Sequence, residues 1–141
     1  MVVFAHAHPI VSASARGRVL KSENALSFWG GVDPYTGIII DQRHDRCGEC
    51  VAGRILLLPS EKGSSTGSAV LLELIRIQRA PAAILTQHLT PILALGAIIA
   101  DELYGTTLPI LTISVEDFAR LNENMALSIS SNGVIHDPSE T

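Results

Sequence analysis

The sequence predicts an α/β domain, because strand-like patterns fill its first third and then alternate with helical patterns. Two apolar runs, at residues 53–58 and 82–86, flank an amphipathic helix expected at about residues 68–79. This order makes a βαβ unit, which implies two parallel strands joined by a right-handed crossover.

The length of 141 residues suggests one domain. We expect a flexible N-terminal segment at residues 1–16, the domain itself at residues 17–136 and a polar tail at residues 137–141. Short strands are expected from residue 17 onward, including residues 25–29 and 38–40, because turn-rich sequence separates these apolar runs.

A second helix is expected to begin at Thr90 and Pro91, as N-cap and first helical residue, and to end at Gly105. It is apolar nearly all round, so we expect it to be buried. A strand at residues 108–113 follows. Ser114 then opens a short helix, and a hairpin at residues 126–135 closes the domain.

Composition excludes several classes of function. The net charge is −4 without a Lys/Arg cluster, so we expect no nucleic-acid partner. No apolar run reaches the length of a membrane-spanning helix, and the first residues lack the basic region of a signal peptide, so a cytoplasmic protein is expected. Apolar residues make up 47% of the chain, which suggests that a partner covers some of its surface.

Residues 62–68 read Lys-Gly-Ser-Ser-Thr-Gly-Ser and form the expected strand-to-helix turn. Such a turn presents backbone N–H groups and the positive end of a helix dipole, which stabilise an anionic group. The pattern is neither a Walker A loop nor a nucleophile elbow. The residues alone leave open a functional site and an ordinary helix start.

Two loops offer further candidate residues. Gly31 and Asp33 shape either a ligand loop or an ordinary turn, and the mixed charges of residues 41–46 either line a pocket or face solvent. Cys47 and Cys50 have C-x-x-C spacing, which suits half a zinc site or a redox pair, although two free thiols are favoured. We assign no metal site to this chain, because two cysteines cannot complete an iron–sulfur cluster.

Four segments occur in order at residues 27–39, 51–56, 63–68 and 80–84, reading SFWGGVDPYTGII, VAGRIL, GSSTGS and APAAI. Together they resemble the small subunit, or swivel domain, of the aconitase X family. The resemblance covers about residues 17–115. It implies a swivelling β/β/α domain like the mobile domain of aconitase.

The resemblance also implies a dehydratase that is active only with a separate large subunit. That subunit carries an iron–sulfur cluster, whose iron acts as a Lewis acid on the departing hydroxyl group. Members dehydrate cis-3-hydroxy-L-proline to 1-pyrroline-2-carboxylate, or phosphomevalonate. Trp29 and the loop at residues 43–49 look more like the branch that uses cis-3-hydroxy-L-proline.

Carried over from the family, the general base is Ser64, with Ser65 as the second choice. Aconitase has an arginine two residues after its serine, where this chain has Thr66, so the substrate carboxylate must be bound by backbone N–H groups, by hydroxyl groups or by the large subunit. The expected substrate-binding residues are Lys62, Gly63, Ser65, Thr66, Gly31 and Asp33.

Three alternatives remain at this point. A phosphomevalonate dehydratase small subunit would need cations for the phosphate, for which Lys62 and Arg54 are the candidates. A non-catalytic module would hold an anion at the same turn. A hydrolase with Ser64 as nucleophile is the least favoured, because the sequence places no His/Asp pair beside it.

Overall fold

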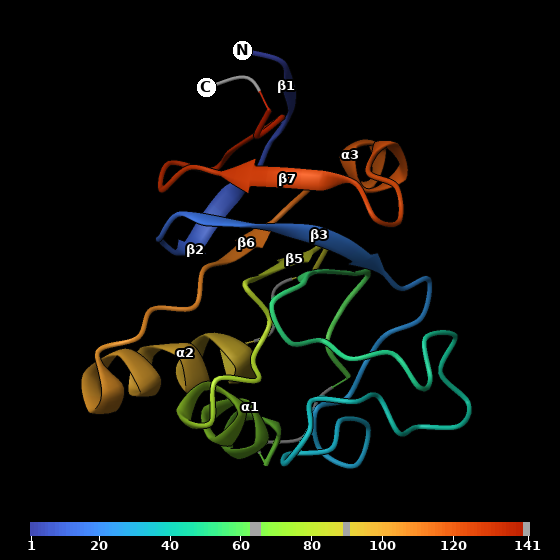
Figure 1. Ribbon diagram of the computed structural model, residues 1–141, viewed down its shortest axis with the longest axis vertical. Helices are drawn as coiled ribbons and strands as arrows, with labels where there is room; N and C mark the ends of the chain where they lie inside the picture. The colour runs from blue at the N-terminus through green and yellow to red at the C-terminus, as the bar shows by residue number, and fades with distance from the viewer. Residues whose placement is uncertain (63–65, 89–90, 140–141) are drawn as a thin grey trace.

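The computed structural model describes residues 1–62, 66–88 and 91–139. Within these residues an eight-stranded sheet carries the helices α1 and α2 side by side against one part of it (Figure 1). The strands are β1 (Val3–His6), β2 (His8–Val11), β3 (Ala15–Lys21), β4 (Ile55–Leu58), β5 (Ala83–Thr86), β6 (Ile110–Thr112), β7 (Ala126–Ile129) and β8 (Val134–His136). The helices are α1 (Gly67–Arg76), α2 (Pro91–Tyr104) and α3 (Val115–Arg120).

The predicted βαβ unit is confirmed. Strands β3, β4, β5 and β6 are parallel neighbours, and α1 connects β4 to β5. All four residues of β4 are buried. Leu56 and Leu58 belong to the hydrophobic core shared with α1 and α2, whereas Ile55 and Leu57 belong to the core on the other face. Burial on both faces explains why this strand is apolar throughout instead of alternating.

The predicted flexible segment at residues 1–16 is wrong, because two strands and the start of β3 lie within it. Strand β1 pairs with β8, and β2 pairs with β6. Both partners lie about a hundred residues or more along the chain, so these strands depend on long-range pairing that local patterns do not reveal. The strand order runs β1-β8-β7-β3-β4-β5-β6-β2, which places β1 and β2 at opposite ends.

Only Ala7 separates β1 from β2 along the chain, so the sheet must curl until its two edges meet. Gly133 lies at this meeting point, where its carbonyl oxygen accepts a hydrogen bond of 2.8 Å from the Ala7 amide. Glycine is required here for two reasons. The φ of Gly133 is +93°, and a Cβ at this position would lie 2.1 Å from the Ala7 carbonyl oxygen.

The early apolar runs do not form the expected strands. In the described residues, 25–29 and 38–40 contribute isolated bridges only, such as Leu26 with Glu61 and Ile38 with Cys50. Helix α1 ends earlier than expected, at Arg76, because Gln78 adopts a left-handed φ of +62° and the Arg79 amide donates back to Leu74.

The second helix is only half buried, which corrects the expectation of a buried helix. Its small residues face α1, and Gly96 packs against the Ser68 backbone. Leu95, Ile98 and Leu103 are more than half exposed. The C-terminal predictions are confirmed: Ser114 caps α3 through the Asp117 amide, and β7 and β8 form an antiparallel hairpin. No helix of the described ranges is long and apolar enough to span a membrane.

Gly133→Ala should destabilise the fold more than Gly48→Ala does. Both glycines have nearly the same φ, +93° and +94°, but nothing lies within 4 Å of a Cβ at position 48. Backbone strain alone should lower the free energy of unfolding by about 1–2 kcal/mol in Gly48→Ala, and the added clash should bring Gly133→Ala to about 2–5 kcal/mol. Urea unfolding measures both. Equal losses would show that the contact at Ala7 is not needed to close the sheet.

Candidate functional site

The parallel strands β3, β4 and β5 end at one edge of the sheet, where ligands bind in open α/β sheets. Residues 22–24 follow β3, residues 59–62 follow β4 and residues 87–88 follow β5. The predicted turn therefore begins at this edge. Of the turn, the structure describes Lys62, which is exposed, and Thr66, which is exposed and occupies the N-cap position of α1.

A polar cavity of about 620 Å³ opens at the same edge. Its charged side chains have both signs, because Arg43 and Lys62 face it together with Glu23 and Asp41. The mixed-charge loop therefore lines a pocket, which the sequence had left undecided. The complete lining is Glu23, Asn24, Ala25, Asp41, Arg43, His44 and Lys62.

A buried hydrogen-bond cluster fastens this loop to the end of β3. The His44 Nδ1 accepts from the Arg46 amide at 3.0 Å, so its Nε2 carries the proton and donates to the Ser22 Oγ at 2.9 Å. The Ser22 hydroxyl lies 2.5 Å from the Asn24 carbonyl oxygen and 3.0 Å from an Asp45 oxygen. His44 therefore cannot accept the Ser22 proton, and the cluster is not a hydrolase triad.

Asp45 completes the cluster as an anion. Burial alone would raise the pKa of its carboxyl group, but hydrogen bonds from the Glu23 amide and from Ser22 lower the pKa overall. The ionised form therefore contributes stability at neutral pH and loses it as the solution becomes acidic enough to protonate Asp45. The cluster holds the cavity wall in place.

Glu61 lies three residues after β4, against Gly67 at the start of α1, and is 4% exposed. Neither of its carboxylate oxygens has a hydrogen-bond partner in the described part of the chain. Burial raises the pKa of this carboxyl group. Sequence reasoning missed Glu61, although a charged residue just after a fully apolar strand is a usable signal.

The remaining predicted site residues are not all brought together. Gly63, Ser64 and Ser65 lie outside the described residues. Gly31 and Asp33 do not line the cavity, and a tight turn accounts for both. A Cβ at Gly31 would lie 2.1 Å from the Ser27 oxygen, and the Asp33 carboxylate accepts from the Tyr35 amide at 2.9 Å.

Arg54 lies at the opposite end of β4 from Lys62, which separates the two cations considered for a phosphate. Its guanidinium donates to the Val19 carbonyl oxygen at 2.7 Å and to the Asn124 side chain at 3.0 Å. It also pairs with Glu123 at 3.4 Å. These contacts give Arg54 a structural role away from the cavity.

The described residues do not fit an iron–sulfur cluster. Cys47 is exposed and Cys50 is partly buried, with its thiol 3.5 Å from the Thr36 carbonyl oxygen. Among the described residues, no three His, Cys, Asp or Glu side chains are grouped to hold a metal ion. This part of the chain therefore offers no ligand set for a cluster.

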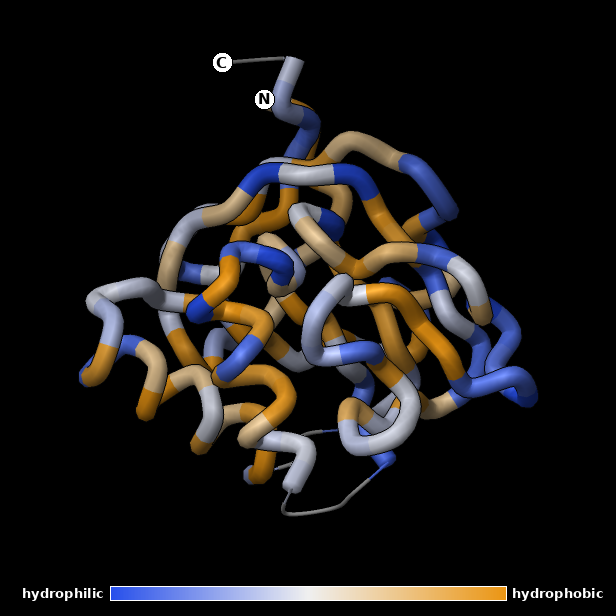
Figure 2. Tube along the Cα trace, turned by 60° about the horizontal axis from the view of Figure 1, so that its bottom comes forward, coloured by the Kyte–Doolittle hydropathy of each residue, from blue (hydrophilic) through white to orange (hydrophobic). Residues whose placement is uncertain are grey.

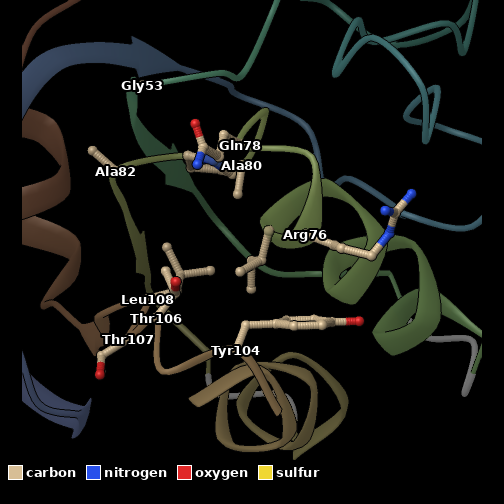
Figure 3. A pocket seen from close by; sticks show the side chains of 11 residues that line it. Gly53, Arg76, Gln78, Ala80, Ala82, Tyr104, Thr106, Thr107 and Leu108 are labelled. Carbon is tan, nitrogen blue, oxygen red and sulfur yellow. The ribbon is translucent and has the colours of Figure 1, made fainter. Parts of the chain in front are cut away.

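A second cavity, of about 560 Å³, lies at the other edge of the parallel strands (Figure 3). Gly53, Ala82 and Leu108 line it, and they precede β4, β5 and β6 respectively. Arg76 and Tyr104 approach it from the ends of α1 and α2. It holds none of the predicted site residues, and its position at the amino ends of the strands separates it from the candidate site.

The polar residues after β3 were also missed by sequence reasoning. Ser22, Glu23 and Asn24 stand immediately beyond a strand, but the sequence does not show which strands lie in parallel next to β4. Their position can be found only once β3 is known to pair with β4.

Comparison with known proteins gives a consistent family match. The family model described as the aconitase X swivel domain matches residues 4–136. The chain is 53% identical over 110 residues to a cis-3-hydroxy-L-proline dehydratase of Pseudomonas aeruginosa, a match that covers 74% of this chain and 19% of the relative. It is 47% identical over 91 residues to a phosphomevalonate dehydratase small subunit of Methanothermobacter thermautotrophicus, covering 64% of this chain and 70% of the relative.

A solved structure agrees over nearly the whole chain. The crystal structure of Thermococcus kodakaraensis aconitase X in its holo-form aligns with a TM-score of 0.84 at 36% identity, covering 94% of this chain and 95% of that one. The expected swivel fold is thereby confirmed. The chain spans about a fifth of the length of the cis-3-hydroxy-L-proline dehydratases that it matches.

Proposed function

Because the chain belongs to the aconitase X swivel-domain family, we propose that it is the small subunit of a dehydratase that converts cis-3-hydroxy-L-proline to 1-pyrroline-2-carboxylate. The observation that carries the choice of substrate is the mixed-charge cavity beside Lys62. The higher identity to the Pseudomonas relative supports the same choice.

The charges of the cavity suit a zwitterion. An imino acid carries one carboxylate and one ammonium group. Arg43 and Lys62 can bind the carboxylate, and Glu23 and Asp41 can bind the ammonium group. A phosphorylated hydroxy acid carries only negative groups, and two of these four side chains would repel it.

Phosphomevalonate remains the second candidate substrate. Its support is that the phosphomevalonate relatives are named small subunits and match this chain over most of their own length. Arg54 no longer counts as a phosphate ligand, because it lies at the other end of β4 and binds backbone carbonyl groups. A phosphate would depend on Arg43 and Lys62.

In the proposed reaction Ser64 removes the Cα proton of the substrate and the 3-hydroxyl group departs. The electron pair of the broken C–H bond forms the C=C bond, and the resulting enamine tautomerises to the 1-pyrroline, so the net loss is one water. The start of α1, just after the turn, supplies N–H groups and a dipole that favour negative charge. Ser65 and Thr66 are proposed to bind the substrate carboxylate.

An iron–sulfur cluster would supply Lewis-acid chemistry, and we assign it to the large subunit. Among the described residues, no three possible ligands are grouped to hold it. The role left to this chain is to supply the base, the cavity and a docking surface for that subunit.

The exposed side of α2 is the surface that we propose for the large subunit. Leu95 and Ile98 lie one turn apart and are each 53% exposed, and Leu103 extends the apolar side toward the end of the helix. Figure 2 shows hydrophobic segments recurring along this helix, which forms one side of the molecule. The longer relatives contain four-fifths of their length beyond the matched region, which supports a large partner as the occupant.

The first test is turnover by this chain purified together with its large subunit. Product should form from cis-3-hydroxy-L-proline only when both chains are present, and phosphomevalonate should give none. Coupled reduction or trapping of the pyrroline measures the product. If phosphomevalonate were dehydrated and cis-3-hydroxy-L-proline were not, phosphomevalonate would be the substrate. Binding of a small anion without any dehydration would favour the non-catalytic module.

Ser64→Ala should abolish most of this activity in the assembled enzyme. Removing a general base lowers kcat by about 10²- to 10⁴-fold. Ser65→Ala is the matched control and should mainly raise KM, because it is proposed to bind substrate. Steady-state kinetics separates the two effects. If kcat were unchanged in Ser64→Ala and fell strongly in Ser65→Ala, Ser65 would be the general base and Ser64 would not.

Ile98→Glu should weaken the complex without unfolding the chain. Burying an apolar side chain of this size contributes about 1.5–3 kcal/mol, so losing it should raise the Kd by about 10- to 100-fold. Val115→Glu, at a 64% exposed position on α3, is the control and should leave the Kd unchanged. Titration calorimetry with the large subunit measures both. Equal Kd values would place the interface elsewhere.

A further inference from the structure

Backbone hydrogen bonds fix one part of the wall of the polar cavity. The segment that follows β3 leads to Leu26, whose amide donates to the Ser60 carbonyl oxygen at 3.2 Å. The Leu26 carbonyl oxygen accepts in turn from the Lys62 amide at 2.8 Å. The lining residues just before Leu26 are therefore held at a fixed spacing from the backbone of Lys62, the cation that lines the same cavity.

The backbone of Glu23 is fixed as well, to the loop that supplies the other lining residues. Its amide donates to the Asp45 carboxylate at 2.8 Å, beside the buried contact between Ser22 and His44. This bond uses only the backbone of Glu23, and its side chain lines the cavity. Within the described residues, the Glu23 carboxylate makes no hydrogen bond or ion pair. The fold thus presents an unengaged carboxylate on a fixed backbone.

Asp41, the second acid of the cavity, is part of a turn. One of its carboxylate oxygens accepts from the Arg43 amide at 3.0 Å, and its carbonyl oxygen accepts from the His44 amide at 3.0 Å. An aspartate side chain that bonds to the backbone two residues along the chain is typical of an Asx-turn. Asp41 therefore shapes the loop that carries Arg43, and the two acids of the cavity are not equivalent.

The two cations of the cavity are not used up by ion pairs. Neither Arg43 nor Lys62 has an acidic partner in the described part of the chain. Both can therefore bind the carboxylate of a ligand. A cyclic imino acid carries its ammonium group on the carbon next to that carboxylate, so an acceptor for the ammonium group is needed in the same cavity.

On the basis of the proposed function, we propose that Glu23 is the specificity-determining residue of the cavity. Its carboxylate binds the ammonium group of a cyclic imino acid, while Arg43 and Lys62 bind the carboxylate. A secondary ammonium group has two N–H donors, and a carboxylate without other hydrogen bonds can accept from either. A ligand that carries only negative groups meets repulsion from the same side chain.

Ligand binding to the complex with the large subunit tests this role independently of turnover. L-Proline has both charged groups but no 3-hydroxyl group to lose, and cyclopentanecarboxylate keeps the ring size and the carboxylate but has no ammonium group. The wild-type complex should bind L-proline about tenfold more tightly, which corresponds to one hydrogen bond between charged groups. In Glu23→Gln the ratio should fall to about threefold or less, because the charge is lost. Titration calorimetry measures both Kd values.

Asp41→Asn is the matched control for charge. It removes one negative charge from the same cavity and keeps an oxygen that can accept from the Arg43 amide. Its preference for L-proline should stay within about twofold of wild type, since the Glu23 carboxylate remains. Glu116→Gln, exposed on α3, should leave both Kd values unchanged. Urea unfolding should show wild-type stability for Glu23→Gln, because the contact with Asp45 uses the backbone amide.

Charge reversal extends the test. In Glu23→Lys the preference should invert, so that cyclopentanecarboxylate binds more tightly than L-proline, because an ammonium group would then face a third cation. If Glu23→Lys still bound L-proline the more tightly, the ammonium group would not lie beside residue 23.

The contrary results are distinct. A tenfold preference retained in a stable Glu23→Gln would overturn the role of Glu23, and its loss in Asp41→Asn alone would give that role to Asp41. A wild-type complex that binds both ligands equally, or neither, would show that the cavity does not recognise the ammonium group. A complex with the Glu23-dependent preference that does not dehydrate cis-3-hydroxy-L-proline would refute the proposed reaction and leave the binding role standing.

Discussion

The burial of β4 on both faces is the constraint on which the rest of the molecule depends. Its four side chains alternate between two hydrophobic cores, one covered by α1 and α2 and the other enclosed by the curled sheet. Parallel partners on either side, β3 and β5, satisfy its backbone. Because every strand of this group ends at the same edge, the residues after each one meet there, which places Glu61 and Lys62 beside the loop that follows β3.

At that edge the chain separates exposed charge from buried charge. Lys62 and Arg43 line a polar cavity together with two carboxylates, Glu23 and Asp41. Asp45 is ionised because hydrogen bonds compensate for its desolvation, and Glu61, which lacks such partners in the described residues, has its pKa raised instead. Acidic side chains thus differ in their surroundings: Asp45 is held by hydrogen bonds, Glu23 and Asp41 line the cavity, and Glu61 is buried with its pKa raised.

The amphipathic layout of α2 links the site to the proposed partner. Gly96 allows the helix to approach the Ser68 backbone in α1, and Ile92 packs where Gly67 begins α1. The inner side of α2 therefore contacts the helix that follows the turn, while Leu95 and Ile98 face outward. A partner docked on this side would lie close to the start of α1, which suits a site that two subunits complete together.

The sequence by itself determined the βαβ unit, α2, the cap at Ser114 and the C-terminal hairpin, because these depend on local periodicity and on residues close together along the chain. The four ordered segments also identified the family and its swivel fold. Only the tertiary structure decided that β1 and β2 are strands, that Arg54 and Lys62 stand at opposite ends of β4, and that Glu61 is buried without a described partner. The physical reason is that pairing across about a hundred residues and the desolvation of a single carboxyl group depend on neighbours in space, which no local pattern records.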